Sequence, residues 1–122
     1  METRNLGPLG PVSALTLGGG GLGQVWGTTS RDEAVATVRR AVDAGITLLD
    51  VAPMYGRGEA EAVVGAAFAG RLPDGVRVGT KVMLGDPGAG EVAARIEKSL
   101  TRARPSSMET PACHARPWNG TN

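Results

Sequence analysis

The chain has 122 residues, of which 41% are hydrophobic, and its 13 Lys and Arg against 12 Asp and Glu leave a net charge of +1. This length fits one ordinary domain, and the hydrophobic share is enough for a packed core, which excludes wholesale disorder. The balanced charge, without a basic block, excludes the electrostatic signature of a nucleic-acid-binding protein.

No apolar run reaches the ~18 residues that a membrane helix needs, and the N-terminus does not read as a signal peptide. The single cysteine, Cys113, has no partner for a disulfide within the chain, which suits a reducing compartment. We therefore expect a cytoplasmic protein that binds neither membrane nor nucleic acid, and we identify no metal site.

The first elements of the chain are short. Residues 4–13 consist of apolar pieces divided by Gly and Pro, which predicts a small hairpin or an extended arm. Residues 14–17 form an apolar run that ends in four consecutive glycines, and they predict a first buried strand.

A helix and a second strand follow. Ser30, with Glu33 three residues later, forms a capping box, and valines at helical spacing predict a helix that starts at Arg31 and stops at Gly45. The apolar run 46–49 predicts the next strand, which ends at Asp50.

The same alternation continues to about residue 103. Apolar positions at helical spacing predict a helix over 60–70, then a strand over 76–80 that ends at Lys81, then a helix over 92–103. Strands that are apolar throughout and alternate with helices indicate a parallel sheet covered by helices, so the fold class is α/β.

Reactive groups in such folds collect at the carboxyl ends of the strands. Asp50 and Lys81 end successive predicted strands, and Tyr55 lies on the loop that follows Asp50. A carboxylate that holds an ammonium beside a phenol is a plausible proton-donating set. On spacing alone, the aspartate is as readily a residue that braces the loop, and the lysine a solvated one.

Residues 48–65 read LLDVAPMYGRGEAEAVVG, residues 79–81 read GTK, and the start of the chain carries RNLG at 4–7 and VSAL at 12–15. These spaced motifs, in this order, resemble the aldo-keto reductase family over residues 4–102. The resemblance implies an eight-fold α/β (TIM) barrel, of which this chain would hold the first three βα units behind a short N-terminal hairpin or arm.

The resemblance also implies an activity, namely the NADPH-dependent reduction of small aldehydes or ketones to alcohols. Asp50, Tyr55 and Lys81 match the catalytic residues of the family, with Tyr55 as the donor of a proton to the carbonyl oxygen. Gly18, Gly19 and again Asp50 match positions near the nicotinamide and are the expected cofactor-binding residues.

The match ends near residue 102. The family's fourth catalytic residue is a histidine that ends a further strand, and His114 follows no strand-like run, so we do not assign that role to it. We divide the chain into a partial barrel at 1–103 and a non-homologous, disordered tail at 104–122. We expect this truncated fragment, which lacks most of the cofactor-binding loops, to be inactive or weakly active alone and to self-associate through its exposed sheet.

Two alternatives stay open. Residues 18–23 contain the spacing G-x-G-x-x-G after a strand, which is typical of a Rossmann-like dinucleotide-binding fragment. That motif should open a helix, whereas the nearest helix cap, Ser30, lies well downstream. The second alternative is a non-catalytic fragment that only associates with other chains.

Overall fold

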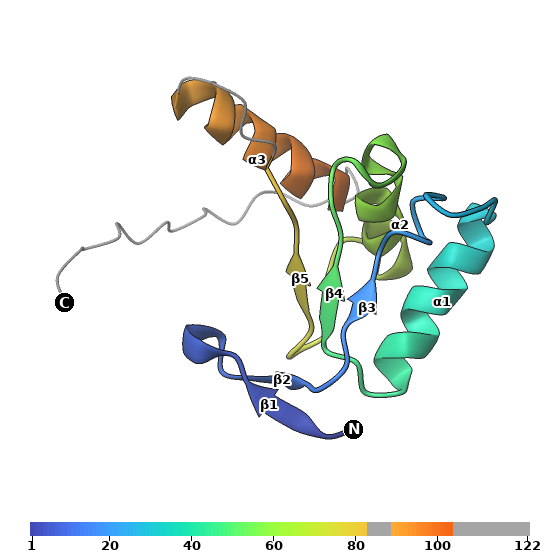
Figure 1. The fold of residues 1–122 in the computed structure, drawn as a ribbon, viewed down its shortest axis with the longest axis vertical. Helices are drawn as coiled ribbons and strands as arrows, with labels where there is room; N and C mark the ends of the chain where they lie inside the picture. Colours follow the sequence, from blue (N-terminus) through green and yellow to red (C-terminus); the bar gives the residue numbers. More distant parts are fainter. Residues whose placement is uncertain (83–88, 104–122) are drawn as a thin grey trace, which may run out of the picture.

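The computed structural model describes residues 1–82 and 89–103, and it has the expected order of strands and helices (Figure 1). The strands are β1 (Thr3–Asn5), β2 (Pro11–Ser13), β3 (Leu17–Gly18), β4 (Leu48–Asp50) and β5 (Arg77–Gly79). The helices are α1 (Arg31–Asp43), α2 (Glu59–Ala67) and α3 (Ala89–Ala103), with 3₁₀ turns η1 (Gly7–Leu9) and η2 (Tyr55–Gly58).

Strands β3, β4 and β5 form a parallel sheet in sequence order, which confirms the predicted α/β class. In the register of this sheet, Asp50 at the end of β4 pairs with Gly18 of β3 on one side and with Gly79 of β5 on the other. The three strands therefore end at one level, and Asp50 lies between two residues that have no side chain.

Helix α1 begins and ends where the sequence predicts. Ser30 accepts a hydrogen bond from the backbone N–H of Glu33, whose carboxylate accepts in return from the Ser30 backbone, so the capping box is complete. The helix stops before Gly45, which has a left-handed φ of 94° that a side chain would disfavour.

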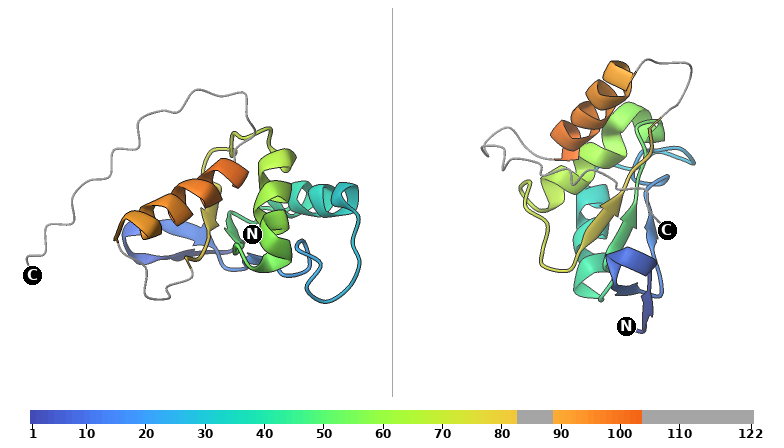
Figure 2. Two further views of the ribbon diagram at one scale, coloured as in Figure 1. Left: turned by 90° about the horizontal axis from the view of Figure 1, so that it is seen from above. Right: turned by 90° about the vertical axis from the view of Figure 1, so that its left-hand side faces the viewer.

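The core lies between the sheet and helices α1 and α2, which cover one of its faces (Figures 1 and 2). Leu49, in the middle of β4, is fully buried, as are Val38 of α1 and Val63 of α2. No helix covers the opposite face of the sheet within residues 1–82 and 89–103. Burying these aliphatic side chains supplies the main stabilisation of the α1–sheet–α2 layer.

The hairpin of β1 and β2 lies across the other end of the sheet, away from the carboxyl ends of the strands (Figure 1). Ser13 and Thr47 exchange two hydrogen bonds, from each backbone N–H to the other hydroxyl oxygen (2.8 and 2.9 Å). Arg77 donates to the Pro11 carbonyl at 3.2 Å. Of the two expectations for residues 4–13, the structure therefore selects the hairpin.

The expectation of a buried strand at residues 14–17 is wrong. The predicted buried strand at 14–17 contributes only its last residue to β3, and Leu15 is 61% exposed because nothing in the described residues packs over it. The apolar stripe of α3 is also incompletely covered, and Ile96 is 42% exposed. The most buried residue of α3 is Ser99, because this helix meets α2 through its C-terminal half.

Candidate active site

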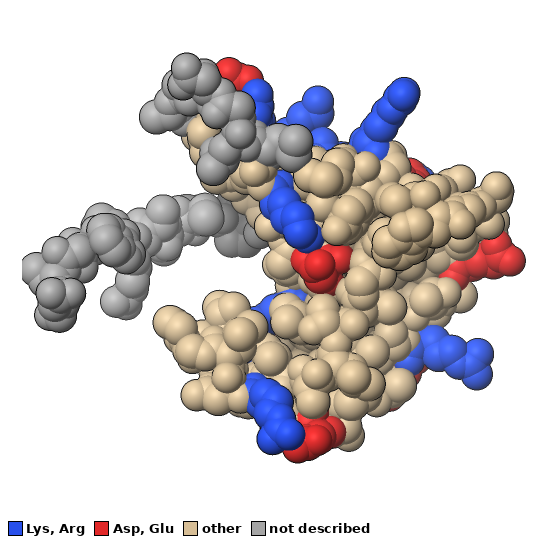
Figure 3. Space-filling view, in the orientation of Figure 1, with Lys and Arg blue, Asp and Glu red and all other residues tan. Residues whose placement is uncertain are grey.

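Asp50 and Lys81 meet at the carboxyl ends of β4 and β5, as their positions at adjacent strand ends predict. The Lys81 ammonium donates to Asp50 Oδ1 at 2.7 Å and to the Val51 carbonyl at 3.0 Å. Both side chains are about half exposed, at 41% for Lys81 and 49% for Asp50. In Figure 3 a basic side chain lies close to an acidic one near the middle of the face in view.

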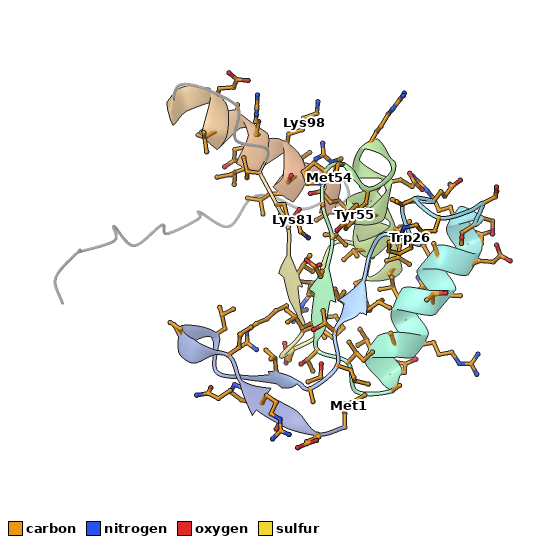
Figure 4. The ribbon with its side chains drawn as sticks, in the orientation of Figure 1. Met1, Trp26, Met54, Tyr55, Lys81 and Lys98 are labelled. Carbon is orange, nitrogen blue, oxygen red and sulfur yellow. The ribbon has the colours of Figure 1, made fainter. Side chains whose placement is uncertain are left out.

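Tyr55 completes the group from the turn that follows β4. The Lys81 ammonium lies over its ring, 5.1 Å from the centroid. Figure 4 shows Tyr55, Lys81 and Met54 at the same end of the sheet, with Trp26 further along that end. The structure thus brings together all three residues that the sequence singles out, and their assignment as catalytic stays a prediction.

Asp50 is the main influence on the charge of Lys81. The hydrogen bond that Asp50 accepts raises the pKa of Lys81 above its ordinary value, and this outweighs the opposing effect of partial desolvation. The phenol of Tyr55 adds a smaller contribution in the same direction. Lys81 is therefore a fixed positive charge at neutral pH, beside the face of the only tyrosine in the chain.

The glycine-rich segment after β3 packs tightly around this group. A Cβ at Gly19 would lie 2.8 Å from Val51 Cγ1, and a Cβ at Gly23 would lie 2.4 Å from the Tyr55 carbonyl carbon. At Gly18, by contrast, a Cβ would meet no atom of residues 1–82 and 89–103 within 4 Å. Of the two expected cofactor-binding glycines, Gly18 therefore borders open space, whereas Gly19 is turned against β4 and donates to the Asp50 carbonyl at 2.7 Å.

Sequence reasoning missed one charged residue near the group. Glu61 lies on α2 and is 1% exposed, with its carboxylate bonded to the Thr80 hydroxyl (2.7 Å) and the Arg102 guanidinium (2.5 Å). A signal was present, because Glu61 lies three residues before the buried Val64 and so falls on the apolar face of the helix.

A comparison with known protein families identifies the family of this chain. The model of the aldo/keto reductase family matches residues 14–115, which is most of the chain. The chain belongs to the aldo/keto reductase family. The members of this family are oxidoreductases, and the three parallel βα units correspond to part of its α/β barrel.

Individual aldo/keto reductases resemble the chain over most of its length. L-galactose dehydrogenase of Arabidopsis thaliana is 36% identical over 130 residues, which cover 93% of this chain and 38% of that protein. Methylglyoxal reductase YeaE of Escherichia coli is 33% identical over 93 residues, covering 76% of this chain and 31% of its own. The present chain thus spans about a third of the length of these curated relatives.

Solved structures give the same result. An aldo-keto reductase of Klebsiella pneumoniae in complex with NADPH superposes with a TM-score of 0.71 at 35% identity, covering 84% of this chain and 35% of that one. Glycerol dehydrogenase AKR11B4 of Gluconobacter oxydans superposes over the same shares with a TM-score of 0.62 at 30% identity. This likeness leaves the Rossmann-like alternative without support, since α1 also starts at Arg31 and not within the glycine segment.

The structure describes only some of the residues on which the remaining expectations depend. His114, Cys113 and the whole predicted tail lie outside the described residues, so the boundary at residue 103 stays a prediction. Within residues 1–82 and 89–103, no helix is long and apolar enough to span a membrane. In the same residues no three His, Cys, Asp or Glu side chains gather as metal ligands.

Proposed function

We propose that this chain carries the proton-donating part of an NADPH-dependent carbonyl reductase, with Tyr55 as the proton donor. The observation that supports this most directly is the position of the Lys81 ammonium, which bonds to Asp50 at 2.7 Å and lies 5.1 Å from the centre of the Tyr55 ring. A cation beside a phenol stabilises the phenolate that is left when the proton has been given away.

Each of the three side chains has a separate task. Tyr55 gives its proton to the oxygen of an aldehyde or ketone as that oxygen gains negative charge. Lys81 stabilises the charge that remains on the phenol oxygen, and Asp50 keeps Lys81 charged and in place. General acid catalysis of this kind contributes ~10²- to 10⁴-fold to a rate.

The residues present fit a nicotinamide cofactor. Asp50 is flanked in the sheet by Gly18 and Gly79, and no described residue comes within 4 Å of a Cβ placed at Gly18. A strand end without side chains leaves room for a flat ring beside the carboxylate. Gly18 and Asp50 would therefore contact the nicotinamide end, where bound NADPH supplies a hydride for the carbonyl carbon.

Apolar side chains near Tyr55 suit a small organic substrate. Trp26 is 80% exposed and its ring lies against the backbone of Gly20, where a Cβ would come within 2.5 Å of a ring carbon. Met54, next to Tyr55, is half exposed. We assign both to the surface that receives the carbonyl compound.

The test uses the chain and a hybrid protein. In the hybrid, residues 14–103 replace the matching segment of the Klebsiella aldo-keto reductase, and NADPH oxidation with 4-nitrobenzaldehyde is followed by absorbance. We expect Tyr55→Phe and Lys81→Met to lower the hybrid's rate at least ~100-fold. Lys98→Met, at the chain's other lysine, is the matched control and should leave the rate unchanged. Full activity of the Tyr55→Phe hybrid would refute the proposal.

The 122-residue chain by itself is a separate case. Its described residues form three of the strands of an eight-stranded barrel, so we expect it to turn over NADPH slowly or not at all. A high rate from the chain alone would contradict this expectation. A chain that associates with other proteins without catalysis remains the alternative, and a hybrid that binds NADPH but shows no turnover would favour it.

A further inference from the structure

The segment that carries Lys81 leaves the sheet before it reaches the site. The last pair in the β4–β5 register joins Asp50 to Gly79, so Thr80 and Lys81 lie beyond the ladder. Side-chain bonds fasten this segment instead. Lys81 reaches Asp50 and Val51, while the Thr80 hydroxyl reaches Glu61 at 2.7 Å.

Glu61 is an unusual residue to find beneath an active site. It is 1% exposed, and a buried carboxylate is costly unless it is paired and hydrogen-bonded. Both of its oxygens are occupied, Oε1 by the Thr80 hydroxyl and Oε2 by Arg102 Nε. The cost of burial is thus offset by two partners that come from two different elements.

The sequence around Glu61 makes room for Arg102. A Cβ at Gly58 would lie 2.5 Å from the Arg102 side chain, and a Cβ at Gly65 would lie 2.8 Å from the Arg102 carbonyl oxygen. Ser99, which is buried, accepts a further bond from this guanidinium at 3.2 Å. Gly58 at the end of η2, Gly65 of α2 and Ser99 of α3 therefore hold the arginine against the carboxylate.

Glu61 is also close in sequence to the proton donor. Tyr55 begins the turn η2, which runs directly into α2, and Glu61 is the third residue of that helix. A single carboxylate therefore links the segment that bears Tyr55 to the segment that bears Lys81. Arg102, from the last turn of α3, pairs with that carboxylate and holds it in place.

We propose that Glu61 is a positioning residue that, held by Arg102 and acting through the Thr80 hydroxyl, sets where Lys81 stands relative to Asp50 and Tyr55. Glu61 does not touch the reacting atoms. Its effect is to fix the backbone at Thr80, so that the next side chain points to the end of β4. The positioning role matters for catalysis only if the proposed function is right, but the experiment below measures it without any turnover.

The test reads the chemistry of the Lys81 amine directly in the full chain. The chain has two lysines, so trace labelling with acetic anhydride followed by peptide mass spectrometry yields Lys81 relative to Lys98 in one sample. Only the uncharged amine reacts. Lys81 faces Asp50 from β4 and Tyr55 from η2, and the hydrogen bond to Asp50 keeps it charged, so we expect it to label more slowly than Lys98.

Thr80→Val removes the hydroxyl at an exposed position and leaves Glu61 paired with Arg102, so the fold should survive. We expect the labelling of Lys81 relative to Lys98 to rise about threefold or more near pH 9–10, because Lys81 is no longer held against Asp50. Thr80→Ser keeps the hydroxyl and should restore the original ratio. Thr37→Val removes an exposed hydroxyl on α1 and is the matched control.

Glu61→Gln should raise the ratio in the same way if the variant folds, as judged by circular dichroism. If it does not fold, Thr80→Val decides alone. A folded Thr80→Val protein with an unchanged ratio overturns the proposal and leaves Glu61 as a tie between α2 and α3. The labelling requires no turnover, so it separates the two proposals. A changed ratio with a fully active Tyr55→Phe hybrid would reject the function and keep the positioning role.

Discussion

Two glutamates of α2 each pair with an arginine from another helix, and the two pairs differ in burial. Comparing them tests how much burial adds to the stabilisation that an ion pair provides. Arg102 pairs with Glu61, with side-chain exposures of 22% and 1%, while Arg31 pairs with Glu59 at 56% and 25%. Both pairs join a guanidinium to a carboxylate, and the two glutamates are two residues apart. Arg31 makes two hydrogen bonds to Glu59, whereas Arg102 makes one to Glu61. A larger loss on replacing Arg102 by methionine than on replacing Arg31 therefore reports burial and not the number of bonds.

The expected magnitudes differ several-fold. Arg102→Met leaves a carboxylate that water cannot reach without a countercharge, which costs ~3–5 kcal/mol in comparable buried pairs. Arg102 is itself partly exposed, so we expect a value near the lower end, about 3 kcal/mol. Arg31→Met removes an exposed pair, for which losses of ~0–1 kcal/mol are usual.

Hydrogen–deuterium exchange of the α2 and α3 amides is the suitable assay, because it reports local opening without requiring one cooperative transition. A loss of about 3 kcal/mol corresponds to exchange roughly 100-fold faster in Arg102→Met. Arg31→Met should change exchange less than about fivefold. Equal effects of the two substitutions would refute the reasoning, because they would show that burial of Glu61 adds nothing to the value of its pair.

Three further predictions concern α1, the glycine segment and the uncovered sheet. Hydrogen bonds from Ser30 lower the pKa of Glu33, so the ionised carboxylate stabilises the start of α1 at any pH above the pKa that Glu33 has in the unfolded chain. The protection of α1 amides from exchange should therefore fade as the pH falls from about 6 to 3, and it should fade less in Glu33→Gln. Gly23→Ala would force a Cβ against the Tyr55 backbone at a cost of ~1–3 kcal/mol and speed exchange at residues 52–58, whereas Gly21→Ala, with open space at its Cβ, should not. Sedimentation velocity of the chain alone should show mass that grows with concentration, because the sheet formed by the described residues has unpaired edges and an uncovered face. A monomer with a sharp thermal transition would contradict this.

Local signals in the sequence predicted a large part of the fold. The capping box at Ser30 and the left-handed Gly45 set both ends of α1, because these are interactions between neighbouring residues. The meeting of Asp50 and Lys81 was also predictable on the condition that the two successive parallel strands they follow are adjacent, which the structure shows.

Burial and long-range pairing were harder to predict. An apolar run such as 14–17 indicates that a strand is possible, but it does not indicate whether other residues pack over that strand. Leu15 proved to be exposed. Glu61 stood within the recognised motif, yet its pairing with Arg102 joins residues 41 positions apart and depends on how α2 crosses α3. No periodicity encodes that crossing, so the partner of this carboxylate could not be predicted from the sequence.

The link between Glu61 and Arg102 also has a consequence for synthesis. A ribosome makes Asp50, Tyr55, Glu61 and Lys81 before it makes Arg102, which belongs to the last turn of α3. Until that turn leaves the exit tunnel, the nascent chain has a carboxylate that its apolar surroundings disfavour and no guanidinium to balance it. The rim of the sheet can therefore reach its final form only after α3 has been translated.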